Sequence, residues 1–201
     1  MENAKPTYRH YGHKMFDRFS FKSVRNSGFN KPIGGFWASR TDSSFGWKEW
    51  NDYSQYQKCE EDAKIVFQLT DRAKVLELRS MEDVKNMNEK YGIKELAYEK
   101  LGYGTVMPLD FEKIKQDYDA IECFISTGYG VYDSMPDWDC DSIVILNPDV
   151  VEQLNLDKKL ATIADKVLSG DPADLDDLTA DDMVEYIFAT KRQVNSYDIF
   201  R

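Results

Sequence analysis

Cysteine is scarce in this sequence of 201 residues, which holds three widely spaced copies at Cys59, Cys123 and Cys140. Their number is odd and no Cys-x-x-Cys pair occurs. This pattern argues against a disulfide framework and against a structural zinc site. A reducing, cytoplasmic setting is therefore the default expectation.

Long apolar runs are also lacking. No stretch approaches the length that spans a bilayer, and the opening residues MENAKPTYRHYG contain no apolar core of a secretory signal. We therefore expect no membrane partner. Positive charge is in deficit as well, since the formal net charge is -10. Such a balance disfavours broad electrostatic binding to a nucleic-acid backbone, although a local basic groove stays possible.

The charge is unevenly distributed along the chain. Acids crowd the region from Asp171 to Glu185, which makes it a candidate surface for a basic partner. Basic residues are frequent early, which favours a site for an anionic small molecule in the first fifty residues. These basic residues are Lys5, Arg9, Lys14, Arg18, Lys22, Arg25, Lys31 and Arg40.

Aromatic residues are plentiful, at 13% of the chain, and charged residues make up 31%. This composition is typical of a folded globular protein. Three of the 4 tryptophans lie in the stretch KPIGGFWASRTDSSFGWKEW, residues 31–50, beside a Gly-Gly pair. Glycine lets a backbone approach a ligand closely, and two aromatic side chains can form the walls of a slot for a flat ring.

Periodicity predicts a mixed α+β body over residues 1–150 and a helical extension over 151–201. We expect strands at 7–11, 36–39, 65–69, 74–78, 120–125 and 142–146, the third and fourth joined by a turn at 70–72. Helices are expected from a start at 41–43, and over 80–91, 111–116, 150–168 and 180–192, with a loop at 128–136.

Two early elements are candidates for chemistry. His10 lies at a strand end before Gly12, where a histidine can bind a ligand or simply be a polar strand-end residue. His10 and His13 could form a metal pair, but no third ligand stands at a suitable spacing. Trp37 and Trp47 could enclose a flat ring, or both could belong to the core.

A third element is WDCDSIVILNPD, in which Asp139 and Asp141 lie two residues apart where an apolar strand begins. Residues two apart share one side of an extended chain, so both carboxylates could face a cleft. They could equally be solvated turn carboxylates. The remaining candidate, YDAIECFIS, predicts a buried strand with little chemistry of its own.

In this order the elements resemble the ADP-ribosyltransferase superfamily, in the branch of diphtheria toxin and the poly-ADP-ribose polymerases, which carries a His-Tyr-Glu triad. RHYG matches the histidine motif at His10, and GFWAS matches the tyrosine motif with Trp37 in the tyrosine position. Trp47 matches a second aromatic ten residues later. DSIVIL matches the late strand with Asp141 in the glutamate position. The likeness covers about residues 7–150 in layout.

The resemblance implies a split β-sheet core with helices, and NAD as the substrate. It implies that Asp141, with Asp139 as a possible second acid, stabilises the oxocarbenium-like charge of the breaking glycosidic bond. Binding of NAD is implied for a larger set of residues. That set is His10, Tyr11, Gly12, Gly35, Phe36, Trp37, Ser39, Ser44 and Trp47.

Two departures from the pattern matter. Trp37 lacks the tyrosine hydroxyl, and Asp141 is one methylene shorter than glutamate, a displacement that can cost about a hundredfold at a reacting centre. The expected function is an NAD-dependent mono-ADP-ribosyltransferase acting on an unidentified protein or nucleic-acid acceptor, or an NAD glycohydrolase with water as acceptor. The alternatives are a catalytically inactive binding or interaction module on the same fold, and an unrelated α+β domain.

The acidic extension has two expected roles. Its apolar stripe of Leu154, Leu160, Ile163 and Val167 could dock on the body and complete the core. Its acidic face could instead meet a basic partner or mask the NAD cleft.

Overall fold

A computed structural model describes residues 5–18, 21–100, 102, 104–156 and 158–195, without the side chains of Tyr129 and of residues 188–195. Its centre is a seven-stranded sheet in the order β4-β7-β8-β2-β1-β3-β9. A separate hairpin joins β5 (Tyr98–Lys100) to β6 (Gly104–Val106). The seven strands are β1 (Thr7–Tyr11), β2 (Phe36–Arg40), β3 (Lys64–Leu69), β4 (Val75–Leu78), β7 (Ala120–Cys123), β8 (Ser142–Ile145) and β9 (Val151–Gln153).

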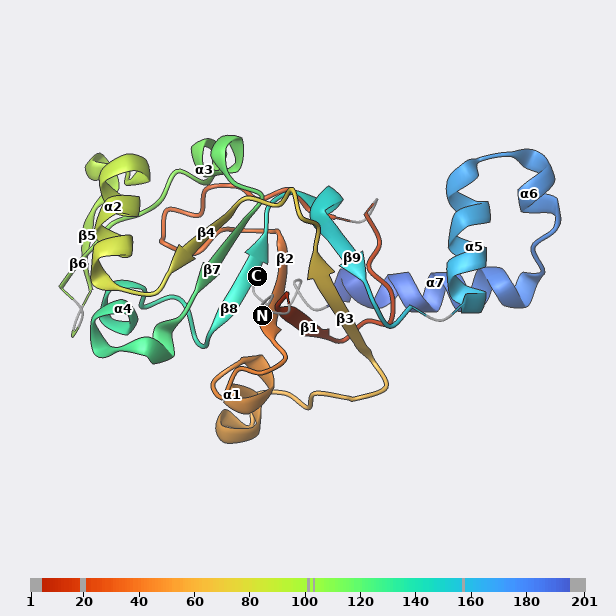
Figure 1. Ribbon diagram of the computed structural model, residues 1–201, viewed down its shortest axis with the longest axis horizontal. Helices are drawn as coiled ribbons and strands as arrows, with labels where there is room; N and C mark the ends of the chain where they lie inside the picture. Colours follow the sequence, from red (N-terminus) through yellow and green to blue (C-terminus); the bar gives the residue numbers. More distant parts are fainter. Residues whose placement is uncertain (1–4, 19–20, 101, 103, 157, 196–201) are drawn as a thin grey trace.

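The sheet parts in its middle. Strands β1 and β2 pair at two positions only, Tyr8 with Arg40 and Arg9 with Ser39. On one side β1, β3 and β9 continue as antiparallel neighbours, and on the other β2, β8 and β7 do the same, with β4 parallel to β7 at the edge. Beyond Arg9 and Ser39 the two halves diverge, as the arrangement of β1 and β2 in Figure 1 shows.

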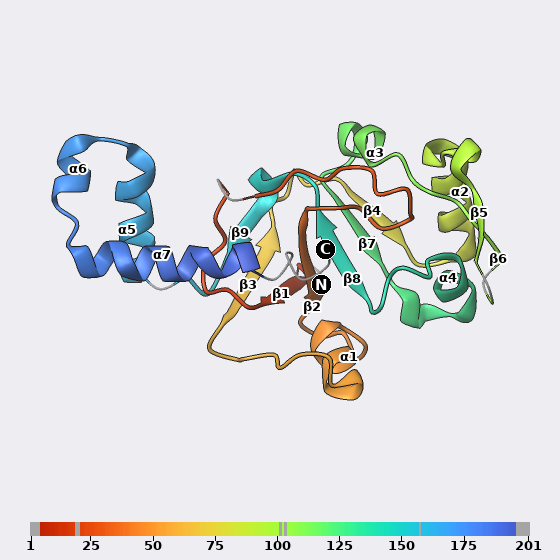
Figure 2. The ribbon, with the colours of Figure 1, turned by 180° about the vertical axis from the view of Figure 1, so that it is seen from behind.

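Some helices pack on this sheet, and the C-terminal helices project beyond one end of it (Figures 1 and 2). Ser80 and Asp83 form a capping box at the start of α2, and Asp110 caps α3 by accepting from the Lys113 amide. No helix in the described residues combines the length and apolar character needed to cross a membrane. The helices are α1 (Trp47–Ser54), α2 (Met81–Tyr91), α3 (Phe111–Asp117), α4 (Tyr129–Ser134), α5 (Lys158–Ser169), α6 (Pro172–Asp176) and α7 (Ala180–Asn195), with 3₁₀ turns at Lys94–Leu96, Ile125–Thr127 and Pro148–Val150.

The alternation of side chains along the strands builds two core clusters. One cluster packs α2, α3 and α4 on the sheet and includes Trp138 and Val144. The other, which includes Tyr8, Phe67 and Ile143, covers β1, β2 and β3. Burial of the large apolar side chains in these two clusters is the main contribution to the stability of the body.

The tail projects from the β9 end of the sheet (Figures 1 and 2). Leu160 and Ala164 of α5 pack with Met15 in a third, small cluster, so part of the predicted apolar stripe is indeed buried, while Leu154 is half exposed. Lys159 bridges α5 to Asp182 and Glu185 of α7. The short helix α6, with its acids, lies at the far tip, so these acids do not cover the sheet.

Several expected boundaries are wrong. Residues 151–153 form an edge strand paired with β3, so the body extends past 150 and the helix of the tail begins at Lys158. Helix α1 begins after Gly46 and not at 41–43. The Ser39 hydroxyl accepts a hydrogen bond from the backbone amide of Trp47, the first residue of the helix. The expected loop at 128–136 contains α4. The turn expected at 70–72 does join β3 to β4, although the two strands lie in opposite halves of the sheet.

Candidate functional site

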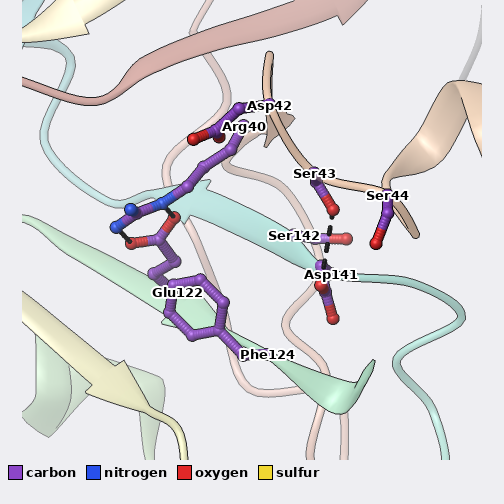
Figure 3. Close-up of a pocket in the computed structure, with 8 residues that line it drawn as sticks. All are labelled: Arg40, Asp42, Ser43, Ser44, Glu122, Phe124, Asp141 and Ser142. Atoms are coloured by element: carbon purple, nitrogen blue, oxygen red, sulfur yellow. Dashed lines mark hydrogen bonds and ion pairs between the residues drawn. The ribbon is translucent and has the colours of Figure 1, made fainter. Parts of the chain in front are cut away.

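A polar cavity of about 240 Å³ opens where β2 and β7 end and β8 begins (Figure 3). Pairing of β2 with β8 and of β8 with β7 brings these three strand ends together. The lining carries three carboxylates, one arginine and three serine hydroxyls, which suits a hydroxylated, polar ligand. The lining residues are Arg40, Asp42, Ser43, Ser44, Glu122, Phe124, Asp141 and Ser142.

Asp141 is the central acid of this cavity, and its side chain is held from two sides. It is 8% exposed. Ser126 donates its backbone amide to Oδ1 at 2.8 Å and its hydroxyl to Oδ2 at 2.6 Å. The hydroxyl of Ser43 lies 3.3 Å from Oδ2. Among the described residues no basic side chain forms an ion pair with Asp141, so hydroxyl and amide donors alone stabilise the carboxylate.

Glu122 is a residue of this cavity that sequence analysis missed. It lies in β7 and is 2% exposed. Arg40 donates two hydrogen bonds to its carboxylate, from Nε to Oε1 and from Nη2 to Oε2, each at 2.7 Å. The hydroxyl of Tyr8 donates to the same carboxylate at 3.3 Å. The hydrogen bond to Glu122 raises the pKa of Arg40, and burial raises the pKa of Tyr8, so both donors keep their protons.

A signal for Glu122 was present in the sequence. A lone glutamate between Ile121 and Cys123 interrupts an apolar strand in which all four residues are buried. Buried acids are rare unless paired, so such an interruption indicates an ion pair or a site. The partner could not be found in the same way, because Arg40 is 82 residues away in the sequence.

Phe124 lines the cavity, and two guanidinium groups lie over its ring. Arg79 Cζ lies 3.6 Å from its ring centre and Arg40 Cζ lies 5.0 Å away. Glu77 neutralises Arg79 through a 2.6 Å bond to Nε and lies 4.0 Å from Arg40. The two arginines are thus balanced by Glu77 and Glu122, so the cavity offers no surplus of positive charge.

His10 lies at the split of the sheet, outside the lining of this cavity. Its Nδ1 lies 2.6 Å from the carbonyl oxygen of Trp37, and its ring packs on His13 at 4.8 Å and on Phe36 at 4.5 Å. The other nitrogen, Nε2, is buried without a partner among the described residues. Burial lowers the pKa of His10 to about 4, so the ring is neutral at pH 7.

The two tryptophans of the expected slot pack on different partners. Trp37 donates its indole N–H to the carbonyl of Gly34 at 3.0 Å and meets Trp138 edge-on at 4.8 Å. Trp47 stacks on Trp50 at 5.2 Å. Neither ring lines the cavity of Asp141. The alternative that these rings belong to the core therefore fits Trp37, which packs against the first core cluster.

The glycines and neighbours of the expected cofactor site serve the fold. Gly35 has φ +74, and a Cβ there would lie 2.5 Å from Val144 Cγ2, so this glycine admits the protein's own β8 and not a ligand. Gly12 turns the chain at φ +104. Tyr11 is buried and donates to Glu61 at 3.1 Å. Phe36 lies in the second core cluster.

The two serines of the expected set differ in role. Ser39 is fully buried, donates to the backbone carbonyl of Asp141 at 2.7 Å and accepts from the Trp47 amide at 2.9 Å. It therefore ties the start of β8 and the start of α1 to β2. Ser44 is exposed and lines the cavity. Of the predicted NAD-binding residues, only Ser44 reaches the cavity, and Ser39 supports it from behind.

Asp139 and Asp141 do not face one cleft. A bend at Cys140 and Asp141 breaks the extended geometry that placed them on one side. Asp139 pairs with Lys31 at 3.1 Å and lines a separate, shallower cavity of about 400 Å³. That cavity is lined by Ser27, Phe29, Lys31, Pro32, Ile33, Pro136, Asp137 and Asp139.

Within the described part of the chain, no three His, Cys, Asp or Glu side chains gather in a geometry that could hold a metal ion. The histidine pair of His10 and His13 packs ring on ring at an interplanar angle of 20°.

Comparison of the chain with protein-family models, with curated proteins and with solved structures gave no match.

Proposed function

We propose that the protein is an NAD-consuming enzyme, an ADP-ribosyltransferase or an NAD glycohydrolase, with its reacting centre at Asp141. The observation that carries the proposal is the buried Asp141 carboxylate, which lines a hydroxyl-rich cavity and has hydroxyl and amide donors as its partners. A carboxylate held in this way is placed to stabilise a positive charge that develops on a substrate.

The split of the sheet supports this proposal. The resemblance implies a split β-sheet, and the pairing of β1 with β2 stops after two residue pairs. His10 and Asp141 both contact β2, His10 through the carbonyl of Trp37 and Asp141 through the hydroxyl of Ser39. Both residues are thus anchored to β2, Asp141 through its backbone carbonyl and His10 through its ring, although His10 does not line the cavity.

The chemistry of the cavity fits cleavage of a glycosidic bond. As the bond from the ribose to nicotinamide breaks, positive charge grows on the ribose, and the Asp141 carboxylate stabilises it. The hydroxyls of Ser43, Ser44 and Ser142 line the cavity and can act as acceptors for ribose hydroxyls. The locked pair of Arg40 and Glu122 gives the cavity a rigid wall.

A second candidate is a binding module without catalysis on the same fold. It is favoured by the packing at the start of β2, where Nε2 of His10 is buried and Trp37 packs on Trp138, outside the cavity. In this case NAD or a related nucleotide binds without losing nicotinamide.

The test is release of nicotinamide from NAD by the pure protein, followed by chromatography, with and without a cell lysate as a source of acceptor. Asp141→Asn keeps the side-chain size and should lower release about a hundredfold, whereas NAD binding measured by calorimetry should be little changed. Asp133→Asn, at an exposed acid on α4, is the matched control. Binding without release by the wild type would favour the second candidate, and neither binding nor release would refute both.

A further inference from the structure

Ser126 is held against the central acid of the cavity by two hydrogen bonds. It lies in the 3₁₀ turn Ile125–Thr127 that follows β7, and the residue is exposed. Its amide fixes the backbone to Oδ1 of Asp141, and its hydroxyl lies 2.6 Å from Oδ2. The Thr127 hydroxyl lies 2.8 Å from the carbonyl oxygen of Arg79 and 2.7 Å from that of Phe124, and the single proton that it shares with these acceptors anchors the same turn. Ser126 is not among the residues that line the cavity, but the residue is exposed and its hydroxyl is fixed against the Asp141 carboxylate, which does line it.

This arrangement is the one that nucleophilic attack by a hydroxyl requires. A serine hydroxyl is a weak nucleophile on its own and needs a neighbouring group to take its proton. We propose that Ser126 is an acceptor at this site, so that the protein transfers one ADP-ribosyl group to its own Ser126 hydroxyl. This inference rests on the proposed function, and it names the acceptor that the sequence left open.

The transfer balances without a further reactant. The bond between C1′ of the ribose and the nicotinamide nitrogen breaks, and nicotinamide leaves with the bonding pair as a neutral molecule. Ser126 Oγ forms the new bond to C1′, and its proton passes to Oδ2 of Asp141 and then to water. Because the positive charge on the ribose develops before the hydroxyl attacks, a carboxylate in contact with the hydroxyl can accept its proton.

The three serines that line the cavity are less suited to this step than Ser126, which contacts Asp141 from outside the lining. Ser43 lies farther from Asp141, at 3.3 Å, and its oxygen also accepts the amide of Phe45 at 3.1 Å. Ser44 lines the cavity, but within the described structure it forms no hydrogen bond to Asp141. Ser142 donates to the carbonyl of Cys140 at 2.9 Å. Ser126 alone combines exposure with a short bond to the carboxylate.

The experiment incubates the pure full-length protein with NAD and measures intact mass, the modified peptide and nicotinamide release together. The wild type should gain one ADP-ribosyl group per chain, located on Ser126. Ser126→Ala should reduce labelling more than about tenfold, and Ser126→Thr, which keeps a hydroxyl, should restore part of it. Ser134→Ala, at a half-buried serine on α4 that does not line the cavity, should label like the wild type.

The outcomes separate this inference from the proposed function. Nicotinamide release with no label, or with a label on another residue, would overturn the role of Ser126 and leave the enzyme assignment standing. Equal labelling of the wild type and Ser126→Ala would do the same. Absence of nicotinamide release from every variant would overturn the proposed function and this inference together.

Discussion

The two ends of strand β2 differ in what they offer a ligand. At its start, Phe36 and Trp37 are packed against aromatic partners, and His10 donates across the split to the Trp37 carbonyl. At its end, Ser39 and Arg40 support an open cavity that is polar on nearly all sides. Aromatic packing closes the start of β2, whereas the ion pair of Arg40 and Glu122 lines the cavity at its end. The resemblance placed ligand contacts at both ends, but the structure offers a cavity at the second.

The largest expected effect is at the closed end. Gly35→Ala should lower the free energy of unfolding by about 4 kcal/mol, since the position combines a left-handed backbone with a clash on Val144. Urea unfolding measures it. Gly12→Ala is the control, because Gly12 has positive φ with nothing within 4 Å of a Cβ, and it should cost about half as much. Equal costs would show that the contact with β8 is unimportant.

At the open end the expected loss is smaller. Glu122→Gln should destabilise the fold by about 3 kcal/mol, because it leaves the Arg40 charge without its buried partner. Glu77→Gln removes an acid 4.0 Å from the same arginine, but its side chain is 45% exposed. It should cost less than about 1 kcal/mol in the same urea titration. A similar loss from both substitutions would contradict the view that burial makes the Glu122 pair essential.

Much of the sheet could be predicted from local pattern. The strands at Thr7–Tyr11, Lys64–Leu69 and Ser142–Ile145 lie close to their expected positions, and the Ser80 capping box starts α2 as expected. The edge strand β9 could not be predicted, because Val151–Gln153 has too few residues for a period and its pairing depends on β3. Tertiary pairing, not propensity, decides such short elements.

The site was predictable only in part, for a related reason. Asp141 was found because its place before an apolar strand is a local signal. The cavity around it depends on Ser126 and Glu122, which come from another strand and turn, and a single sequence does not show which strands will be neighbours. Trp37 and Trp47 could not be placed from the sequence in the same way, because the ring of Trp37 packs on Trp138, which is distant in the sequence.

His10 gives the closed end a pH dependence of intermediate size. Burial lowers the pKa of His10 from the ordinary value of 6.5 to about 4, so the unfolded chain binds this proton more tightly than the folded one. Stability is therefore full above pH 6.5 and is lost as the pH falls toward 4, by at most roughly 3 kcal/mol.

Thermal unfolding of the wild type and His10→Gln between pH 4 and 7 measures this loss. Glutamine keeps a donor for the Trp37 carbonyl but does not titrate in this range, and His13 is present in both proteins. The variant should lose less stability on acidification than the wild type. Parallel pH profiles would show that His10 titrates normally and that the closed end is open to water.

The smallest expected effect concerns Asp139, two residues from the central acid but outside its cavity. Its carboxylate pairs with Lys31 at 3.1 Å, and the two side chains are 44% and 37% exposed. Exposed pairs of this kind contribute little, so Asp139→Asn should change the free energy of unfolding by less than about 0.5 kcal/mol. Nicotinamide release should also be unchanged, in contrast to Asp141→Asn. A loss of release with unaltered stability would mean that Asp139 turns toward Asp141 when substrate binds. The boundary between the two cavities would then be part of the site.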